Sequence, residues 1–293
     1  MSSLTHLAPD LRLIRCNNPS PMTGDGTNSY ILGSGDLCII DPGPDDPDHL
    51  AQLLAAVGDD KVACILVTHS HKDHSPLAPA LASATGAPVL AYGDSRAGQS
   101  ALMQRLAAEG VSGGEGVDPA FRPDRDLQDG EVVGFGQNRI TAIWTPGHMG
   151  NHMCFQWRDM IFTGDHVMGW APSLVSPPDG DMGAYMASLA KLADLGARVF
   201  HSGHGAPITD PAARIAELTT HRKARESAIL AELGEGPATI DKLTRRIYTD
   251  LNPALHKAAA RNVFAHLVDL HNREVVKAHK SLHPMAEFSL LQS

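Results

Sequence analysis

Three histidines and one aspartate lie within six residues of one another in the segment THSHKDH at positions 68–74. The segment directly follows an apolar run, Val62–Val67, that predicts a buried strand. Neutral imidazole and carboxylate are the usual nitrogen and oxygen ligands of zinc and related divalent ions, and a loop at a strand end can bring them together. A polar, solvated turn is the alternative, but this arrangement arises by chance in well under roughly 1% of chains of this length. The segment therefore predicts a metal site that uses His69, His71, Asp73 and His74.

Three further segments each place one potential ligand directly after a predicted strand. They are TPGH at 145–148, TGD at 163–165 and SGHG at 202–205, and they supply His148, Asp165 and His204. The glycines allow the backbone to turn sharply and to pass close to a metal. A single histidine in such a place is more often an ordinary core or surface residue. The repetition at successive strand ends indicates one shared site.

Short apolar runs alternate with helical patterns over roughly the first 210 residues, which predicts an α/β fold. The predicted strands are Tyr30–Leu32, Leu37–Ile40, Val62–Val67, Val89–Ala91, Ile140–Trp144, Met153–Trp157, Met160–Phe162 and Arg198–Phe200. The predicted helices are Asp48–Val57, Pro76–Ala84, Ser95–Glu109 and Met182–Leu195. Ser75 is the expected cap of the second helix, and Asp181 that of the fourth.

The pattern becomes helical after Pro211, with helices predicted at Pro211–Leu233, Ile240–Asp250 and Pro253–Asn272 and a short strand at Val275–Ala278. Three helices and a β-wing are typical of a small winged-helix-like unit. A chain of 293 residues also exceeds the usual size of a single core. We therefore predict a catalytic domain at residues 1–220 and a winged-helix-like domain at residues 221–293.

The composition predicts a soluble, cytoplasmic protein with no membrane partner. The N-terminal segment lacks the apolar core of a signal peptide, and no stretch approaches the roughly 18 apolar residues that span a bilayer. The four cysteines form no CxxC pair, as expected of reduced thiols. The net charge is −9, and residues 221–293 hold 11 Lys and Arg against 8 Asp and Glu. This acidic balance disfavours broad binding to a phosphate backbone unless the tail or a bound metal supplies a positive field.

The order of the motifs THSHKDH, TPGH, GD and GHG resembles that of the metallo-β-lactamase superfamily, and IDPGP at 40–44 is similar to its first conserved turn. The resemblance implies an αββα sandwich for the catalytic domain. It also implies two divalent metal ions, one held by His69, His71 and His148 and the other by Asp73, His74 and His204, with Asp165 bridging both. The true zinc β-lactamases carry Cys where Asp165 stands, so antibiotic hydrolysis is not expected.

The C-terminal segment resembles the winged-helix tail of the β-lactamase-like protein 2 group, through residues 221–230, 247–248, His256, Ala259, Asn262 and 266–267. That group includes single-strand endoribonucleases, and related fungal enzymes cleave polyketide thioesters. The resemblance alone does not choose between these two chemistries. For the tail itself, a lid over the active site is favoured over nucleic-acid binding, because its positive charge is small and not clustered.

Two divalent ions can share a water and present hydroxide as a nucleophile at neutral pH. We expect such a metal-bridging hydroxide, oriented by Asp73 as the catalytic residue. Zinc is the expected metal, although manganese and iron accept the same ligands. A non-catalytic metal-binding protein would be expected to lack ligands, and none is missing here.

The leaving group separates the substrate classes, because a thiolate leaves without protonation whereas an amine or alkoxide usually needs an acid. His166 and Tyr185 are weak candidates for that acid, and the loop Trp170–Asp181 is a place where substrate could enter. We expect hydrolysis of a carboxylic thioester or ester in a small-molecule acyl substrate. Cleavage of single-stranded RNA and hydrolysis of a lactone are the alternatives.

Overall fold

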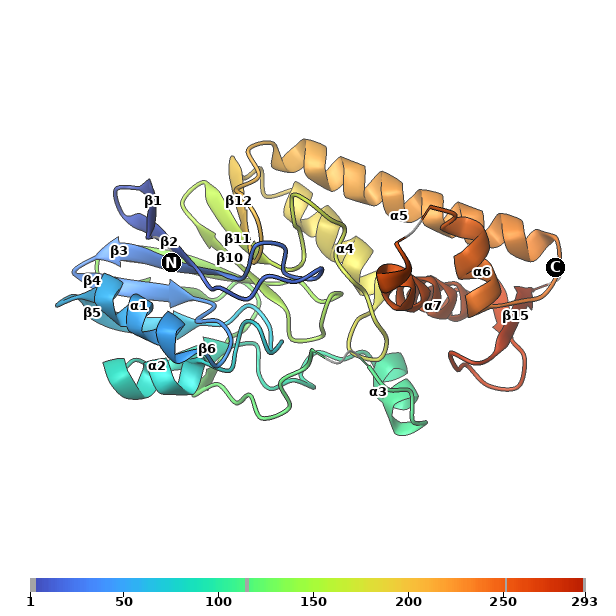
Figure 1. Ribbon diagram of the computed structural model, residues 1–293, viewed down its shortest axis with the longest axis horizontal. Coiled ribbons are helices and arrows are strands. Elements are labelled where there is room, and N and C mark those ends of the chain that lie inside the picture. The colour runs from blue at the N-terminus through green and yellow to red at the C-terminus, as the bar shows by residue number, and fades with distance from the viewer. Residues whose placement is uncertain (1–3, 114–115, 251, 292–293) are drawn as a thin grey trace.

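Two β-sheets lie face to face in the computed structural model, which describes residues 4–113, 116–250 and 252–291 (Figure 1). The first sheet has the strand order β1 to β7, with bounds Thr5–Ala8, Leu11–Arg15, Asn28–Ser34, Asp36–Ile40, Lys61–Leu66, Val89–Ala91 and Arg125–Asp126. The second sheet has the order β12-β11-β10-β9-β8, with bounds Val199–Ser202, Met160–Gly164, Met153–Trp157, Asn138–Trp144 and Val132–Phe135.

Helices cover the outer face of each sheet, which gives four layers and confirms the predicted αββα sandwich (Figure 1). The covering helices are α1 (Pro47–Val57) and α2 (Ala78–Thr85) on the first sheet, and α4 (Met182–Ala193) and α5 (Pro211–Gly234) on the second. Alternation along a strand explains the layers. In β4, Cys38 and Ile40 pack between the sheets, whereas Leu37 and Ile39 pack in the cluster that includes α1 and α2.

Parallel pairing places the predicted ligand loops at one edge of the sandwich. Strands β4, β5 and β6 are parallel to one another, and β11 is parallel to β12, so the carboxyl ends within each set lie together. Backbone hydrogen bonds join the two sheets at this edge, from Asn28 N to Gly203 O (2.8 Å) and from Met153 N to Thr68 O (2.7 Å). Loops that are far apart in the sequence therefore meet at one edge.

Two predicted helix starts are wrong. Helix α2 begins at Ala78, because Ser75 Oγ donates to Asp118 Oδ2 (2.8 Å) instead of capping the helix. Helix α3 spans Ala101–Ala108 and begins six residues later than predicted, since Ser100 Oγ caps it by accepting from Met103 N. The predicted cap at Asp181 is confirmed, because its Oδ1 accepts from Ala184 N (3.1 Å). The short strands β1, β2, β7 and β8 were not predicted.

The C-terminal unit contains the helices and the small sheet that the sequence predicts. Its helical elements after α5 are α6 (Ile240–Ile247), the 3-10 turn η1 (Pro253–Leu255) and α7 (His256–Asn272), and its sheet has the order β13-β15-β14 with bounds Ala238–Thr239, Glu287–Leu290 and Val276–Ala278. Helix α5 runs through the predicted boundary at residues 220 and 221 without a break. The division into two domains at that position stays a prediction.

The core of the C-terminal unit includes three buried side chains from the N-terminal part of the chain, Met103, Leu106 and Val111. Met103 and Leu106 of α3 pack in one buried cluster with residues of α5, α6 and α7, such as Leu243 and Leu267.

All four cysteines are buried and free. None of the described helices combines the length and apolarity needed to cross a bilayer.

We predict that Leu106→Ala lowers the free energy of unfolding by about 2–5 kcal/mol, because the change opens a cavity in this shared core. Leu106 has 0% of its surface exposed. Equilibrium unfolding in urea measures the effect. Arg105→Ala, on the exposed face of α3, is the control and should change the free energy by less than about 0.5 kcal/mol. Equal effects of the two substitutions would show that α3 does not contribute to the core.

Candidate metal centre

The structure brings all seven predicted ligands together in two groups that share one carboxylate. The first group is His69, His71, His148 and Asp165, and the second is Asp73, His74, Asp165 and His204. Within each group, one ligand atom from each residue lies within 4.8 Å of all the others. The residues come from the loops after β5, β9, β11 and β12. Their role as metal ligands stays a prediction, which the geometry of each group supports.

Three imidazole nitrogens converge in the first group. His71 Nδ1 lies 2.9 Å from His69 Nε2 and 3.0 Å from His148 Nε2. His148 Nδ1 donates to the carbonyl oxygen of Leu174 (2.6 Å), which leaves its Nε2 with a lone pair. His69 Nδ1 lies 3.0 Å from Thr68 Oγ1. Because this hydroxyl donates its proton to the carboxylate of Asp41, it accepts from His69 Nδ1, which likewise leaves His69 Nε2 with a lone pair. Lone pairs that point at one place fit a bound cation.

Three buried atoms of the second group have no hydrogen-bond partner among the described residues, namely His74 Nε2, His204 Nε2 and Asp165 Oδ1. Asp165 Oδ1 lies 3.4 Å from His74 Nε2 and 3.3 Å from His204 Nε2. Buried polar atoms without partners are rare, and a metal ion would satisfy all three. The residues present therefore fit a divalent ion in this group as well.

The two groups differ in their protonation. Burial lowers the pKa of His71 to about 3, and it also lowers the pKa values of His69 and His148, so these imidazoles are neutral at neutral pH. Burial acts in the same direction on His204, but the carboxylate of Asp165 helps to outweigh it and raises the pKa of His204 to about 9. A metal ion entering the second group would therefore displace a proton.

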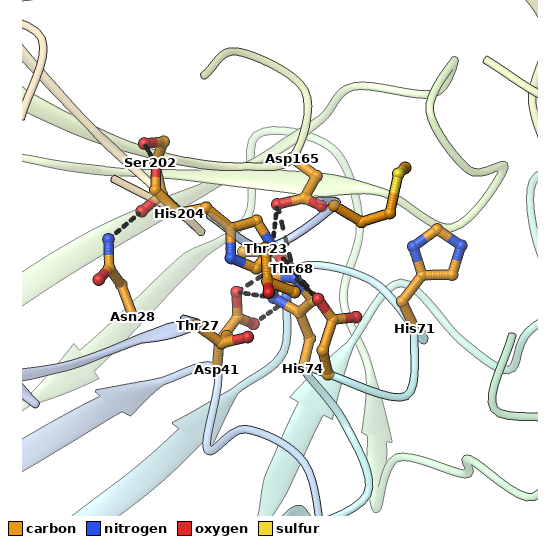
Figure 2. Close-up of polar contacts among 12 residues, drawn as sticks. Thr23, Thr27, Asn28, Asp41, Thr68, His71, His74, Asp165, Ser202 and His204 are labelled. Atoms are coloured by element: carbon orange, nitrogen blue, oxygen red, sulfur yellow. Dashed lines mark hydrogen bonds and ion pairs between the residues drawn. The ribbon is translucent and has the colours of Figure 1, made fainter. Parts of the chain in front are cut away.

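Asp41, which the sequence pattern placed only in a turn similar to one of the superfamily, contacts one predicted ligand directly and a second through Thr68. Its Oδ2 accepts from His74 Nδ1 (2.9 Å) and from Thr68 Oγ1 (2.8 Å), and its Oδ1 accepts from Thr68 N (2.7 Å) (Figure 2). Through Thr68 the same carboxylate also orients His69. Asp41 thus holds one ligand of each group, a role that a carboxylate directly after a strand end could have suggested.

Glycines beside the ligands provide the space that the sequence analysis expected. A Cβ on Gly203 would lie 2.6 Å from both Asp165 Oδ1 and His74 Cε1. A Cβ on Gly164 would lie 2.7 Å from Thr68 Oγ1. Any side chain at these positions would therefore push a predicted ligand, or the residue that holds it, out of place.

The C-terminal helices hold the loop that orients His148. Asn262 Oδ1 on α7 accepts from Val175 N (3.1 Å) and from Arg222 Nη1 (3.1 Å), and Arg222 Nη2 donates to the carbonyl oxygen of Ser173. The carbonyl of Leu174, which accepts from His148, lies between these two attachment points. The sequence analysis assigned no role to Asn262 or Arg222 at the metal site, because their contacts join segments far apart in the chain.

A cavity of about 350 Å³ opens onto both groups, with His71, Asp73, His148 and Asp165 in its lining. Leu174, Ser176 and Asp179 of the loop where substrate was expected to enter also line it. His166 and Tyr185, the candidate acids, do not line it, and both are fully buried. Burial lowers the pKa of His166 to about 3, so this residue is unsuited to protonating a leaving group at neutral pH.

We predict that Asp41→Ala weakens metal binding by about 10–100-fold, because His74 and Thr68 lose the acceptor that orients them. Competition with a chromophoric chelator measures the affinity. Asp45→Ala, an exposed carboxylate in the same loop, is the matched control and should bind metal as the wild type does. Unchanged affinity in Asp41→Ala would show that the ligands are held without this carboxylate.

We also predict that the zinc-loaded wild type holds two ions per chain after gel filtration, as measured by elemental analysis. His71→Ala and His204→Ala each remove a ligand from one group and should retain about one ion. Asp165→Ala should retain fewer than one, because both groups use this carboxylate. His279→Ala removes an exposed histidine outside both groups and should retain two. A single ion in the wild type would contradict the two-group arrangement.

The sequence matches two families, the Metallo-beta-lactamase superfamily over residues 22–204 and the Beta-lactamase associated winged helix domain over residues 239–281. The chain is 30% identical over 276 residues to an atrochrysone carboxyl ACP thioesterase of Aspergillus chevalieri, with 88% of this chain and 80% of that protein covered. It is 29% identical over 266 residues to a lactamase-like protein of Emericella nidulans, with 85% and 77% covered.

Two solved structures resemble the protein over nearly its whole length. A metallo-beta-lactamase family protein from Thermus thermophilus has a TM-score of 0.78 at 27% identity, and the match covers 98% of this chain and 100% of that one. A beta-lactamase domain protein from Burkholderia ambifaria has a TM-score of 0.77 at 19% identity, with 98% and 93% covered, and shows the likeness of the fold alone. From its sequence motifs, its four-layer fold and these matches, the chain belongs to the metallo-β-lactamase superfamily of hydrolases, with an associated winged-helix domain at its C-terminal end.

Proposed function

We propose that the protein is a dinuclear metal-dependent hydrolase of carboxylic thioesters, with zinc as the metal. The observation that carries the proposal is the pair of ligand groups that share Asp165 and open onto one cavity. When bound, two divalent ions supply an activated water at neutral pH and stabilise the negative charge that develops on a carbonyl oxygen.

Asp73 is the catalytic residue in this proposal. Its side chain is 26% exposed and lines the cavity, whereas His74 and His204 beside it are buried. Burial opposes the ionisation of Asp73, but His74 and His204 hold the pKa of this carboxyl well below its usual range. The carboxylate can therefore accept a hydrogen bond from the attacking water and aim the water at the substrate.

The chemistry of the leaving group makes a thioester a better substrate for this cavity than an amide. A thiolate departs without a proton, and neither of the candidate acids, His166 and Tyr185, reaches the cavity. The name of the Aspergillus chevalieri relative, atrochrysone carboxyl ACP thioesterase, supports the same class of reaction. An oxygen ester with a good leaving group, or a lactone, would place a similar carbonyl in the same cavity.

Cleavage of single-stranded RNA is the second candidate, because the cavity also carries the cationic side chains Lys257 and Arg261. Two observations favour hydrolysis of a small-molecule thioester over cleavage of RNA. The formal net charge of −9 repels a polyanion, and a cavity of about 350 Å³ has the size of a small-molecule site.

We predict that the zinc-loaded protein hydrolyses acyl thioesters faster than matched oxygen esters and lactones, with no cleavage of a fluorescently quenched single-stranded RNA. Asp73→Ala should lower kcat/KM for thioesters by at least about 100-fold, because it removes a ligand and the group that orients the water. Asp59→Ala removes an exposed carboxylate that belongs to neither group and precedes β5, whereas the ligand segment follows that strand, and it should keep the wild-type rate. Asp73-dependent cleavage of RNA beside inert thioesters would replace this proposal with the nuclease.

A further inference from the structure

One wall of the active-site cavity comes from the C-terminal unit. Ala254 in η1 and Lys257, Ala258 and Arg261 in α7 all line the cavity. Residues three, four and seven positions apart lie on the same face of a helix, so these four side chains form one continuous stripe. The stripe contains two cationic side chains, Lys257 and Arg261, and two small apolar ones, Ala254 and Ala258.

The other described residues of the cavity lining include no lysine and no arginine. The ligand groups supply carboxylates and imidazoles, and Met22, Met168 and Leu174 supply apolar surface. Asp179 also lines the cavity and lies close to Gly113, where an added Cβ would be 1.7 Å from Asp179 Oδ2. Among the described residues of the lining, positive side chains are therefore confined to the α7 wall.

Arg261 is held in place by a neutral partner. Its Nη1 donates to Ser176 Oγ (2.8 Å), and Ser176 is itself 5% exposed. No described carboxylate lies within ion-pair distance of the Arg261 guanidinium. Because a guanidinium has five N–H donors, a positioned arginine without an anionic partner can bind a carboxylate or phosphate through two of them.

The contact with Ser176 also locates the guanidinium relative to the ligands. Ser176 lies two residues after Leu174, whose carbonyl oxygen accepts from His148 Nδ1. Arg261 therefore lies on the His148 side of the cavity, and Lys257, one helical turn earlier, lies on the same wall.

We propose that Arg261 on the α7 wall forms an anion-binding subsite, and that the substrate is an amphipathic thioester with an anionic group remote from the scissile carbonyl. The apolar part of the substrate packs on Met22, Met168 and Leu174, while the anion on Arg261 orients the carbonyl toward the ligand groups. The reaction rests on the proposed function, whereas the subsite can be tested by binding alone.

The test compares two N-acetylcysteamine thioesters of equal size, glutaryl and its carboxamide analogue, on the zinc-loaded full-length protein. In a third substrate, the carboxamide acyl group is attached to coenzyme A. Its negative charges therefore lie on the thiol side of the thioester and not on the acyl side. We predict that the wild type has a kcat/KM at least about tenfold higher for an anionic substrate than for the neutral thioester, because a site that binds a charged group discriminates against its neutral isostere. Arg261→Gln should remove most of that ratio, and Arg261→Lys should restore part of it.

Two controls separate binding of the anion from a structural effect. Ser176→Ala removes the hydrogen-bond partner of Arg261 but keeps its charge, and Lys277→Gln removes a cation of β14 that does not line the cavity. Lys277→Gln should preserve the ratio between anionic and neutral substrates, and Ser176→Ala should lower it only in part, because the charge stays while the group that positions it is lost. The proposal is wrong if Arg261→Gln lowers kcat/KM equally for all three substrates, or if Lys277→Gln lowers the preference as much as Arg261→Gln does.

Calorimetry distinguishes failure of the subsite from failure of the proposed reaction. Glutarate offers one carboxylate to the metal groups and a second to Arg261, whereas glutaramate offers only one. If no thioester is hydrolysed but glutarate binds more tightly than glutaramate in the wild type and not in Arg261→Gln, the reaction is wrong and the subsite stands. Arg261-dependent RNA cleavage without discrimination among the thioesters would overturn the small-molecule proposal.

Discussion

The buried carboxylate of Asp41 is the contact on which the rest of the site depends. It accepts two hydrogen bonds from Thr68 and one from His74, and so fixes the turn after β5 that starts the ligand segment. Its backbone N–H donates to Leu66 O (2.9 Å), which ties the end of β4 to the end of β5. Asp41 has a φ of 52°, a conformation uncommon for a non-glycine residue. Three charge-assisted or buried hydrogen bonds offset both this strain and the cost of burying the carboxylate.

The C-terminal helices are as much a part of the site as the sandwich is. Arg222 has 2% of its surface exposed, and its guanidinium lies 5.0 Å from the centre of the Tyr185 ring while it holds the carbonyl of Ser173. Together with Asn262 it fixes the loop whose Leu174 carbonyl orients His148. The same helices supply one wall of the cavity. The associated domain therefore helps to shape the pocket, because it supplies part of the lining.

The elements that sequence patterns predicted well are those with a strong local signal. The long apolar runs of β5 and β10, the proline at the start of α5 and the capping Asp181 of α4 each determine structure within a few residues. The late start of α3 follows from a local cap at Ser100, whereas other errors occur where a tertiary contact outweighs the local signal. Ser75 resembles a helix cap, but its hydroxyl donates to Asp118, 43 residues further along the chain. The two-residue strand β7 exists only because β6 lies beside it.

The sequence by itself determined the identity of the seven predicted ligands and their position after strands, because a cluster such as THSHKDH and the glycines beside His148, Asp165 and His204 are local features. It also determined that the chain alternates strands and helices. The resemblance to the superfamily implied two groups with Asp165 in common, but only the tertiary structure decided that the loops bring these residues together, since that requires the ends of two sheets to meet. It likewise decided that Asp41, Leu174 and Asn262 hold the ligands and that Arg261 lines the cavity. These roles depend on contacts between segments as many as 87 residues apart, which no local pattern encodes.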